Sequence, residues 1–112
     1  MTAKLVVPRA LARQDVEEAV VYYAREAGAE VALGFIDALE QAYAALAAYP
    51  AAGSLRYAFE LNLPGLRCWT LRSYPYLVFY RDVPAQVDVW RVLHGQRDIP
   101  AWMPGPDENS DL

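Results

Sequence analysis

The chain has 112 residues, 55% of them apolar, a net charge of −4 and a single cysteine, Cys68. This length allows one hydrophobic core and one cysteine allows no internal disulfide, so we expect a single domain over residues 1–103 in a reducing cytoplasm. The acidic balance argues against nucleic-acid binding, one histidine cannot form a zinc site, and the short N-terminal apolar run predicts neither secretion nor a membrane span.

The first predicted elements are a short strand at residues 4–7 and a helix at about 9–26. Apolar residues recur at steps of three and four along the helix. Asp15, Glu18 and Arg25 are assigned to positions off this apolar stripe, on the polar side of an amphipathic helix. The helix should therefore bury only its apolar side.

A second helix is predicted between Gly28 and Pro50. Gly28 tolerates the left-handed backbone that ends many helices, and Pro50 cannot continue a helix. Because the connection between the two helices is short, they should form an antiparallel helical hairpin. The acidic side chains along the hairpin are interpreted as a solvated face.

Strands are predicted at 66–72, 74–81 and 87–93, which are rich in β-branched and aromatic residues, with a loop at 82–86. They should form an antiparallel meander, and the apolar run within 74–81 is typical of a central strand covered on both faces. The preceding turn-rich segment holds at most a short strand around 55–59. Residues 104–112 are predicted to be a disordered acidic tail. The fold class is α+β, with the N-terminal strand and the helical hairpin packed on a small, mainly antiparallel sheet.

Three segments resemble the RelE/ParE toxin superfamily in their order and spacing. They are Gly65-Leu66-Arg67, the strand YLVFYR ending at Arg81, and the segment RVLHGQRD at 91–98, which is the most specific. The resemblance covers roughly residues 3–99 and favours the ParE branch. It implies a cytoplasmic toxin of a bacterial type II toxin–antitoxin system that is held inactive by a ParD-like antitoxin, in a heterotetramer or a larger complex.

The resemblance implies one of two targets. In the ParE branch the target is DNA gyrase, inhibited by binding, and in the RelE branch it is messenger RNA, cut on the ribosome. A ribonuclease needs a base, an acid and cations around the phosphate, and the candidates for such a set are His94, Arg81, Arg91 and Arg56. Relatives that cleave RNA commonly have a C-terminal catalytic Tyr or His, whereas here no tyrosine follows Tyr80. We therefore expect no catalytic residues, with a non-toxic antitoxin-binding relative as a third alternative.

Arginine and aromatic side chains are the candidates for contacts with the antitoxin or the target. They are Arg67, Arg72, Arg81, Arg91, Arg97, Trp102 and Tyr22. The structural alternative is that His94 bonds backbone or Asp98, and that Arg91, Arg97 and Asp98 form ion pairs that close the sheet. No phosphate loop or carboxylate cluster with metal spacing occurs, so neither a cofactor nor a metal is implied.

Overall fold

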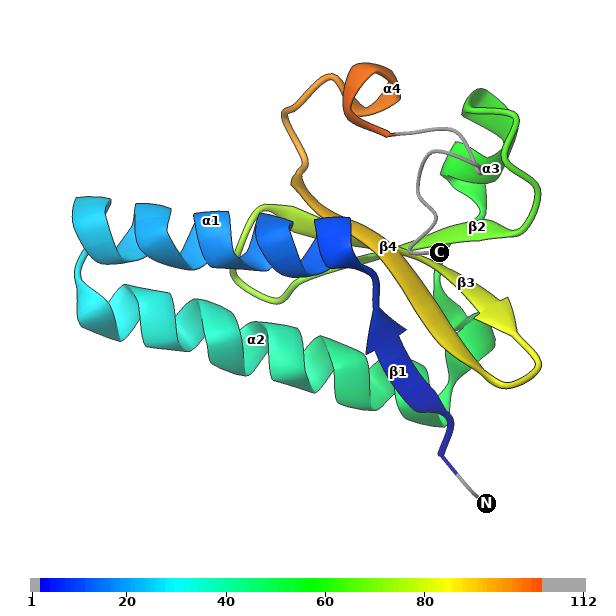
Figure 1. Ribbon diagram of the computed structural model, residues 1–112, viewed down its shortest axis with the longest axis horizontal. Helices are drawn as coiled ribbons and strands as arrows, with labels where there is room; N and C mark the ends of the chain where they lie inside the picture. Colours follow the sequence, from blue (N-terminus) through cyan, green and yellow to red (C-terminus); the bar gives the residue numbers. More distant parts are fainter. Residues whose placement is uncertain (1–2, 104–112) are drawn as a thin grey trace.

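The computed structural model describes residues 3–103 as an α+β fold in which a helical hairpin packs against a four-stranded sheet (Figure 1). Its elements are β1 (Leu5–Pro8), α1 (Ala10–Glu26), α2 (Ala29–Ala48), the 3-10 turn η1 (Pro50–Ala52), α3 (Arg56–Glu60), β2 (Leu66–Thr70), β3 (Tyr76–Val83), β4 (Gln86–His94) and α4 (Ile99–Trp102). This architecture confirms the predicted fold class. The predicted acidic tail at 104–112 lies outside the described residues.

The sheet places the first strand of the chain beside the last. Its strand order is β1-β4-β3-β2, in which β2, β3 and β4 are antiparallel neighbours and β1 runs parallel to β4. Pro8 ends β1, an edge strand, where a missing N–H interrupts no central ladder. Ion pairs hold both ends of β1, from Lys4 to Asp82 at 2.5 Å and from Arg9 to Asp88 at 2.8 Å.

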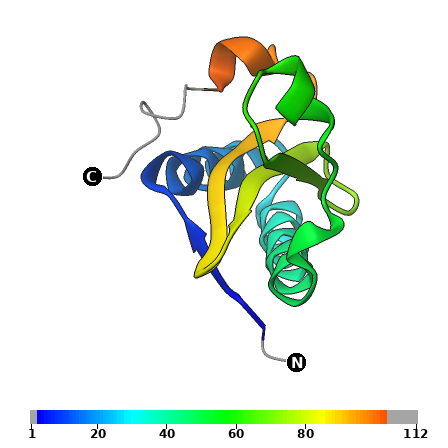
Figure 2. The ribbon, with the colours of Figure 1, turned by 90° about the vertical axis from the view of Figure 1, so that its right-hand side faces the viewer.

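The central strands β3 and β4 are covered on both faces. Successive side chains of a strand point to opposite faces, so Tyr76, Val78 and Tyr80 pack with the helical hairpin, whereas Leu77 and Phe79 pack with α3 and α4. Figure 2 shows the two layers on opposite sides of the sheet. The prediction of a central strand covered on both faces is therefore confirmed.

The helical hairpin supplies most of the apolar cover of the first face. Phe35, Leu39 and Leu46 of α2 are buried there. Among the described residues, α2 is the one helix whose length and composition would allow it to cross a membrane. Its apolar side packs in the core with β3 and β4, as in the core helix of a globular fold.

The segment between the hairpin and β2 differs from its prediction. The strand expected around 55–59 is wrong, because α3 occupies this segment. Tyr57 and Ala58 are buried against the second face of the sheet, and the Ser54 hydroxyl accepts a hydrogen bond from the Arg56 amide at 3.1 Å. A helical turn buries these neighbouring side chains together, whereas a strand would point them to opposite faces.

Two buried hydroxyl groups in the core between the helical hairpin and the sheet have contrasting environments. The Tyr80 hydroxyl donates to the Pro50 carbonyl at 2.7 Å and accepts from the Gly53 amide at 2.9 Å, which ties β3 to η1. The Tyr43 hydroxyl of α2 is buried and has no hydrogen-bond partner among residues 3–103. Burial raises the pKa of Tyr43 to about 12, and nearby Asp15 contributes in the same direction.

Candidate functional site

A β-bulge in β4 positions the first part of the site. Phe79 stands opposite Arg91, whereas the next residue of β3, Tyr80, stands opposite Val89, so Trp90 is the extra residue of β4. A bulge bends its strand and re-aims the side chains beside it. Here it allows Trp90 to pack between the sheet and the helices α3 and α4, while Arg91 reaches toward α1.

Arg91 forms a buried ion pair with Asp15 of α1. Its Nε donates to Asp15 Oδ2 at 2.7 Å and its Nη2 to Oδ1 at 2.6 Å, and the two side chains are only 9% and 5% exposed. Asp15 Oδ2 also accepts from the Val92 amide at 3.0 Å, and Arg91 Nη1 donates to the Trp102 carbonyl at 2.5 Å. This pair therefore joins α1, β4 and α4.

The assignment of Asp15 to the polar side of α1 is thus wrong. Asp15 lies three residues after Ala12 and four before Ala19, and both alanines are buried. That spacing places it on the apolar side of the helix. A carboxylate at such a position needs a buried partner, and this signal in the sequence points to Arg91 or another cation.

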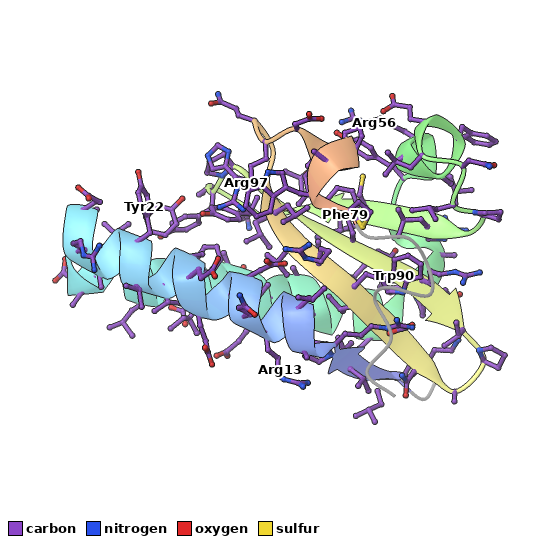
Figure 3. The ribbon with its side chains drawn as sticks, turned by 45° about the horizontal axis from the view of Figure 1, so that its top comes forward. Arg13, Tyr22, Arg56, Phe79, Trp90 and Arg97 are labelled. Atoms are coloured by element: carbon purple, nitrogen blue, oxygen red, sulfur yellow. The ribbon has the colours of Figure 1, made fainter. Side chains whose placement is uncertain are left out.

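A groove of about 390 Å³ lies between α1 and the end of β4. Buried Ala19, Tyr76 and Val92 contribute its apolar lining. The other residues that line it are Asp15, Glu18, Tyr22, Tyr23, His94, Gln96 and Arg97. We call this the α1–β4 groove. In Figure 3, Tyr22 and Arg97 lie on the same side of α4, and Arg56 lies on its other side.

His94 is held by local contacts at the end of β4. Its Nδ1 accepts a hydrogen bond from the Gln96 amide at 3.1 Å, and its ring packs edge-on against Tyr76 with centroids 5.2 Å apart. Of the two contacts expected for His94, to the backbone or to Asp98, the backbone contact is present, and its partner is the Gln96 amide. No hydrogen bond to the Asp98 side chain occurs within residues 3–103. In a neutral ring with this acceptor, the proton resides on Nε2.

Half-buried Arg97 and two exposed aromatic side chains form the outer part of the site. The guanidinium of Arg97 stacks over Trp102 at 4.1 Å from the ring centroid, and Trp102 is 46% exposed. Tyr22 is 56% exposed across the groove. Burial raises the pKa of Tyr76 between them, partly offset by Arg97. Three of the predicted interaction residues therefore lie at or beside one groove, with Arg91 buried beneath.

The other predicted interaction residues lie elsewhere. Arg67 donates to the Ala51 and Gly53 carbonyls at 3.0 and 2.9 Å, which fixes η1. Arg81 lies over Trp90 at 5.8 Å from the ring centroid, and Arg72 is exposed after β2. The ion-pair cluster expected among Arg91, Arg97 and Asp98 does not form within the described residues, because Arg91 pairs with Asp15 instead.

The four candidates for a ribonuclease set do not converge. His94 stands opposite Tyr76 of β3. Tyr76 and Arg81 are five residues apart along this strand, so His94 and Arg81 are separated by about 16 Å and lie on opposite faces of the sheet. Arg91 is buried in its ion pair, and Arg56 bonds the neighbouring Tyr57 hydroxyl at 2.7 Å on α3. Among residues 3–103, no group of three or more His, Cys, Asp or Glu side chains is placed to hold a metal ion.

Comparisons with known proteins identify the family and the fold. Residues 6–99 match the family described as the ParE toxin of the type II toxin-antitoxin system, parDE. A solved structure, the chromosomal ParDE TA system from P. aeruginosa, shares the fold with a TM-score of 0.68 and 20% identity, covering 82% of this chain and 96% of that chain. No curated protein sequence matches significantly. Because the family match spans β1 to the start of α4, the chain belongs to the ParE toxin family of type II toxin-antitoxin systems.

Proposed function

We propose that this ParE-family toxin acts in the cytoplasm by inhibiting DNA gyrase, and that it does not cut messenger RNA. The observation that supports this choice is the separation of His94 from Arg81 across the sheet. General acid–base chemistry on one phosphate requires its groups within hydrogen-bond reach of the same few atoms. Two side chains on opposite faces cannot meet that requirement, whereas inhibition by binding needs only a complementary surface.

We also propose that a ParD-like antitoxin neutralises the protein by occupying the α1–β4 groove. The groove has an apolar lining, the exposed ring of Tyr22 and the guanidinium of Arg97, which stacks on the exposed ring of Trp102 beside the groove. Arg97 forms no ion pair within residues 3–103. Aromatic and arginine side chains are the usual anchors of protein interfaces. The groove therefore suits an antitoxin segment that presents an apolar side chain next to a carboxylate, in a heterotetramer or a larger complex.

The experiment that tests the target is induced expression in a bacterial host with and without the cognate antitoxin. Viability, plasmid supercoiling and messenger RNA integrity are measured together, and purified gyrase is assayed with the purified toxin. We expect growth arrest, altered supercoiling and intact messenger RNA, all reversed by the antitoxin. Fragmented messenger RNA with unchanged gyrase activity would instead establish a ribonuclease, and no arrest at all would indicate a relative that only binds the antitoxin.

A matched pair of variants sharpens this test. The double variant His94→Ala/Arg81→Ala removes two of the four ribonuclease candidates. If the protein acts on gyrase by binding, this variant should still arrest growth, provided that its circular dichroism spectrum shows a folded protein. Arg72→Ala, at an exposed position after β2, serves as a control for the loss of an arginine. The proposal would be contradicted if the folded double variant lost all toxicity while Arg72→Ala kept it.

A further inference from the structure

The exposed side of α1 carries a second hollow, which no residue of the sheet lines and which shares Glu18 and Tyr22 with the α1–β4 groove. Glu17, Glu18, Val21, Tyr22 and Arg25 line it, and all five side chains come from this one helix. Val21 and Tyr22 are large apolar groups that remain 55% and 56% exposed. Within this set, Glu18, Val21, Tyr22 and Arg25 have the spacing i, i+3, i+4, i+7, which forms the hole that receives a side chain in knobs-into-holes packing. We call these four residues the α1 patch.

The α1 patch is complementary to itself under a two-fold rotation. A two-fold axis that lies between the two helices, level with the midpoint of positions 21 and 22, brings residues whose numbers sum to 43 to the same height along the pair. Val21 and Tyr22 lie on opposite sides of the centre line of the patch, so Val21 then faces Val21 of the other copy and Tyr22 faces Tyr22. Glu18 and Arg25 lie near that line, so Glu18 faces Arg25. Both apolar side chains are covered, and each carboxylate faces a guanidinium. From this pattern we infer that the α1 patch binds the same patch of a second copy of the chain, with the two α1 helices antiparallel.

Charge determines both the orientation and the occupant. In a parallel pair Glu18 would face Glu18 and Arg25 would face Arg25, and like charges at such contacts are unfavourable. A two-fold symmetric interface uses the same surface on both subunits, so the placement of acid and base on opposite sides of one centre specifically fits a second copy. The patch extends over two turns of one helix and is smaller than a standard interface, so we expect a weak dimer that forms only at high protein concentration.

Sedimentation equilibrium over a range of concentrations and salt tests the dimer without any antitoxin present. The wild-type protein should associate reversibly, and added salt should weaken association because exposed ion pairs are screened. Arg25→Glu and Glu18→Arg should each weaken self-association by roughly tenfold, since each places like charges opposite one another twice per dimer. Glu40→Arg makes the same charge change at an exposed position of α2 and should leave association unchanged.

Mixing the two single variants gives the decisive result. In a mixed dimer, the Arg25→Glu chain carries carboxylates at both charged positions of the α1 patch, and the Glu18→Arg chain carries guanidinium groups at both. Each carboxylate would then face a guanidinium, so the equimolar mixture should recover association that neither variant shows alone. A monomer at every concentration, or a mixture no stronger than the single variants, would overturn the inference. The inference would also be overturned if the protein stayed monomeric and Arg25→Glu lost antitoxin affinity, because the patch would then belong to the antitoxin.

This inference is independent of the proposed target. A strictly monomeric protein that still inhibits gyrase would disprove the dimer and leave the proposed function intact. Conversely, a dimer that fails to arrest growth would leave the α1 patch assignment standing.

Discussion

Asp15 and Arg91 lie 76 positions apart in the sequence and form a buried, bidentate ion pair between α1 and β4. The same carboxylate accepts the Val92 amide at the point where β1 no longer covers the edge of β4. Arg91 in turn holds the carbonyl of Trp102 in α4. One pair of side chains thus satisfies an edge amide of β4 beyond its pairing with β1, and connects the two helical layers that cover the sheet.

Removing one member of this pair should be strongly destabilising. Arg91→Met leaves the Asp15 carboxylate buried without its cation, and we expect the free energy of unfolding to fall by about 3–5 kcal/mol in urea denaturation. The double variant Asp15→Leu/Arg91→Met removes both charges and should be more stable than Arg91→Met. If the double variant instead lost the sum of the two single effects, the pair would not be energetically coupled.

The Tyr80 hydroxyl should contribute measurably to stability. Tyr80→Phe leaves the Pro50 carbonyl and the Gly53 amide without this partner. We expect a loss of about 1–3 kcal/mol in the free energy of unfolding. Tyr43→Phe is the matched control, because the hydroxyl that it removes has no partner, and its removal should be neutral or stabilising by up to about 1 kcal/mol. Equal losses in both variants would contradict this interpretation.

Stability should decrease at alkaline pH, with Tyr43 as one cause. The pKa of Tyr43 rises from 10.0 to about 12 in the folded chain, so the folded state holds this proton more tightly than the unfolded state. Its contribution is fully present below pH 10.0 and is lost as the pH rises toward about 12. Denaturant titrations across this range should show a smaller decrease for Tyr43→Phe than for the wild type. An identical decrease in both proteins would exclude Tyr43 as a source.

Variants at the α1–β4 groove should weaken the proposed antitoxin complex. Tyr22→Ala removes an exposed anchor and Arg97→Ala a half-buried one. We expect each to cost about 1–3 kcal/mol in binding, measured by isothermal titration calorimetry with the purified antitoxin. Arg72→Ala, in the turn between β2 and β3 and outside the groove lining, is the matched control. Antitoxin affinity that is insensitive to both groove variants would place the binding surface elsewhere.

Periodic patterns predicted the larger elements well. The apolar repeats before Gly28 and Pro50 correspond to α1 and α2, and the apolar run that begins at Tyr76 corresponds to the central strand β3. These signals depend on burial of whole faces over many residues, which local contacts do not override. The expected loop at 82–86 was too long, because the strands continue to a turn at Pro84 and Ala85.

Short elements and long-range partners were not predictable in the same way. Each of α3 and α4 has five residues or fewer, which is too short for a periodic signal, and each is stabilised by contacts with the second face of the sheet. The pairing of Asp15 with Arg91 depends on a bulge that no local pattern announces. The gathering of Tyr22, Arg97 and Trp102 likewise follows from how β4 and α1 meet.

The parallel pairing of β1 with β4 has a consequence for synthesis of the chain. A ribosome makes β1 well before its partner strand Gln86–His94, because the helical hairpin and two further strands lie between them in the chain. The ion pairs of Lys4, Arg9 and Asp15 can form only after the segment from 82 to 91 has been made. Local pairing of α1 with α2 can form early, whereas closure of the sheet must wait until β4 has been translated. A nascent chain that stalls before Gln86 therefore has neither the α1–β4 groove nor a closed sheet.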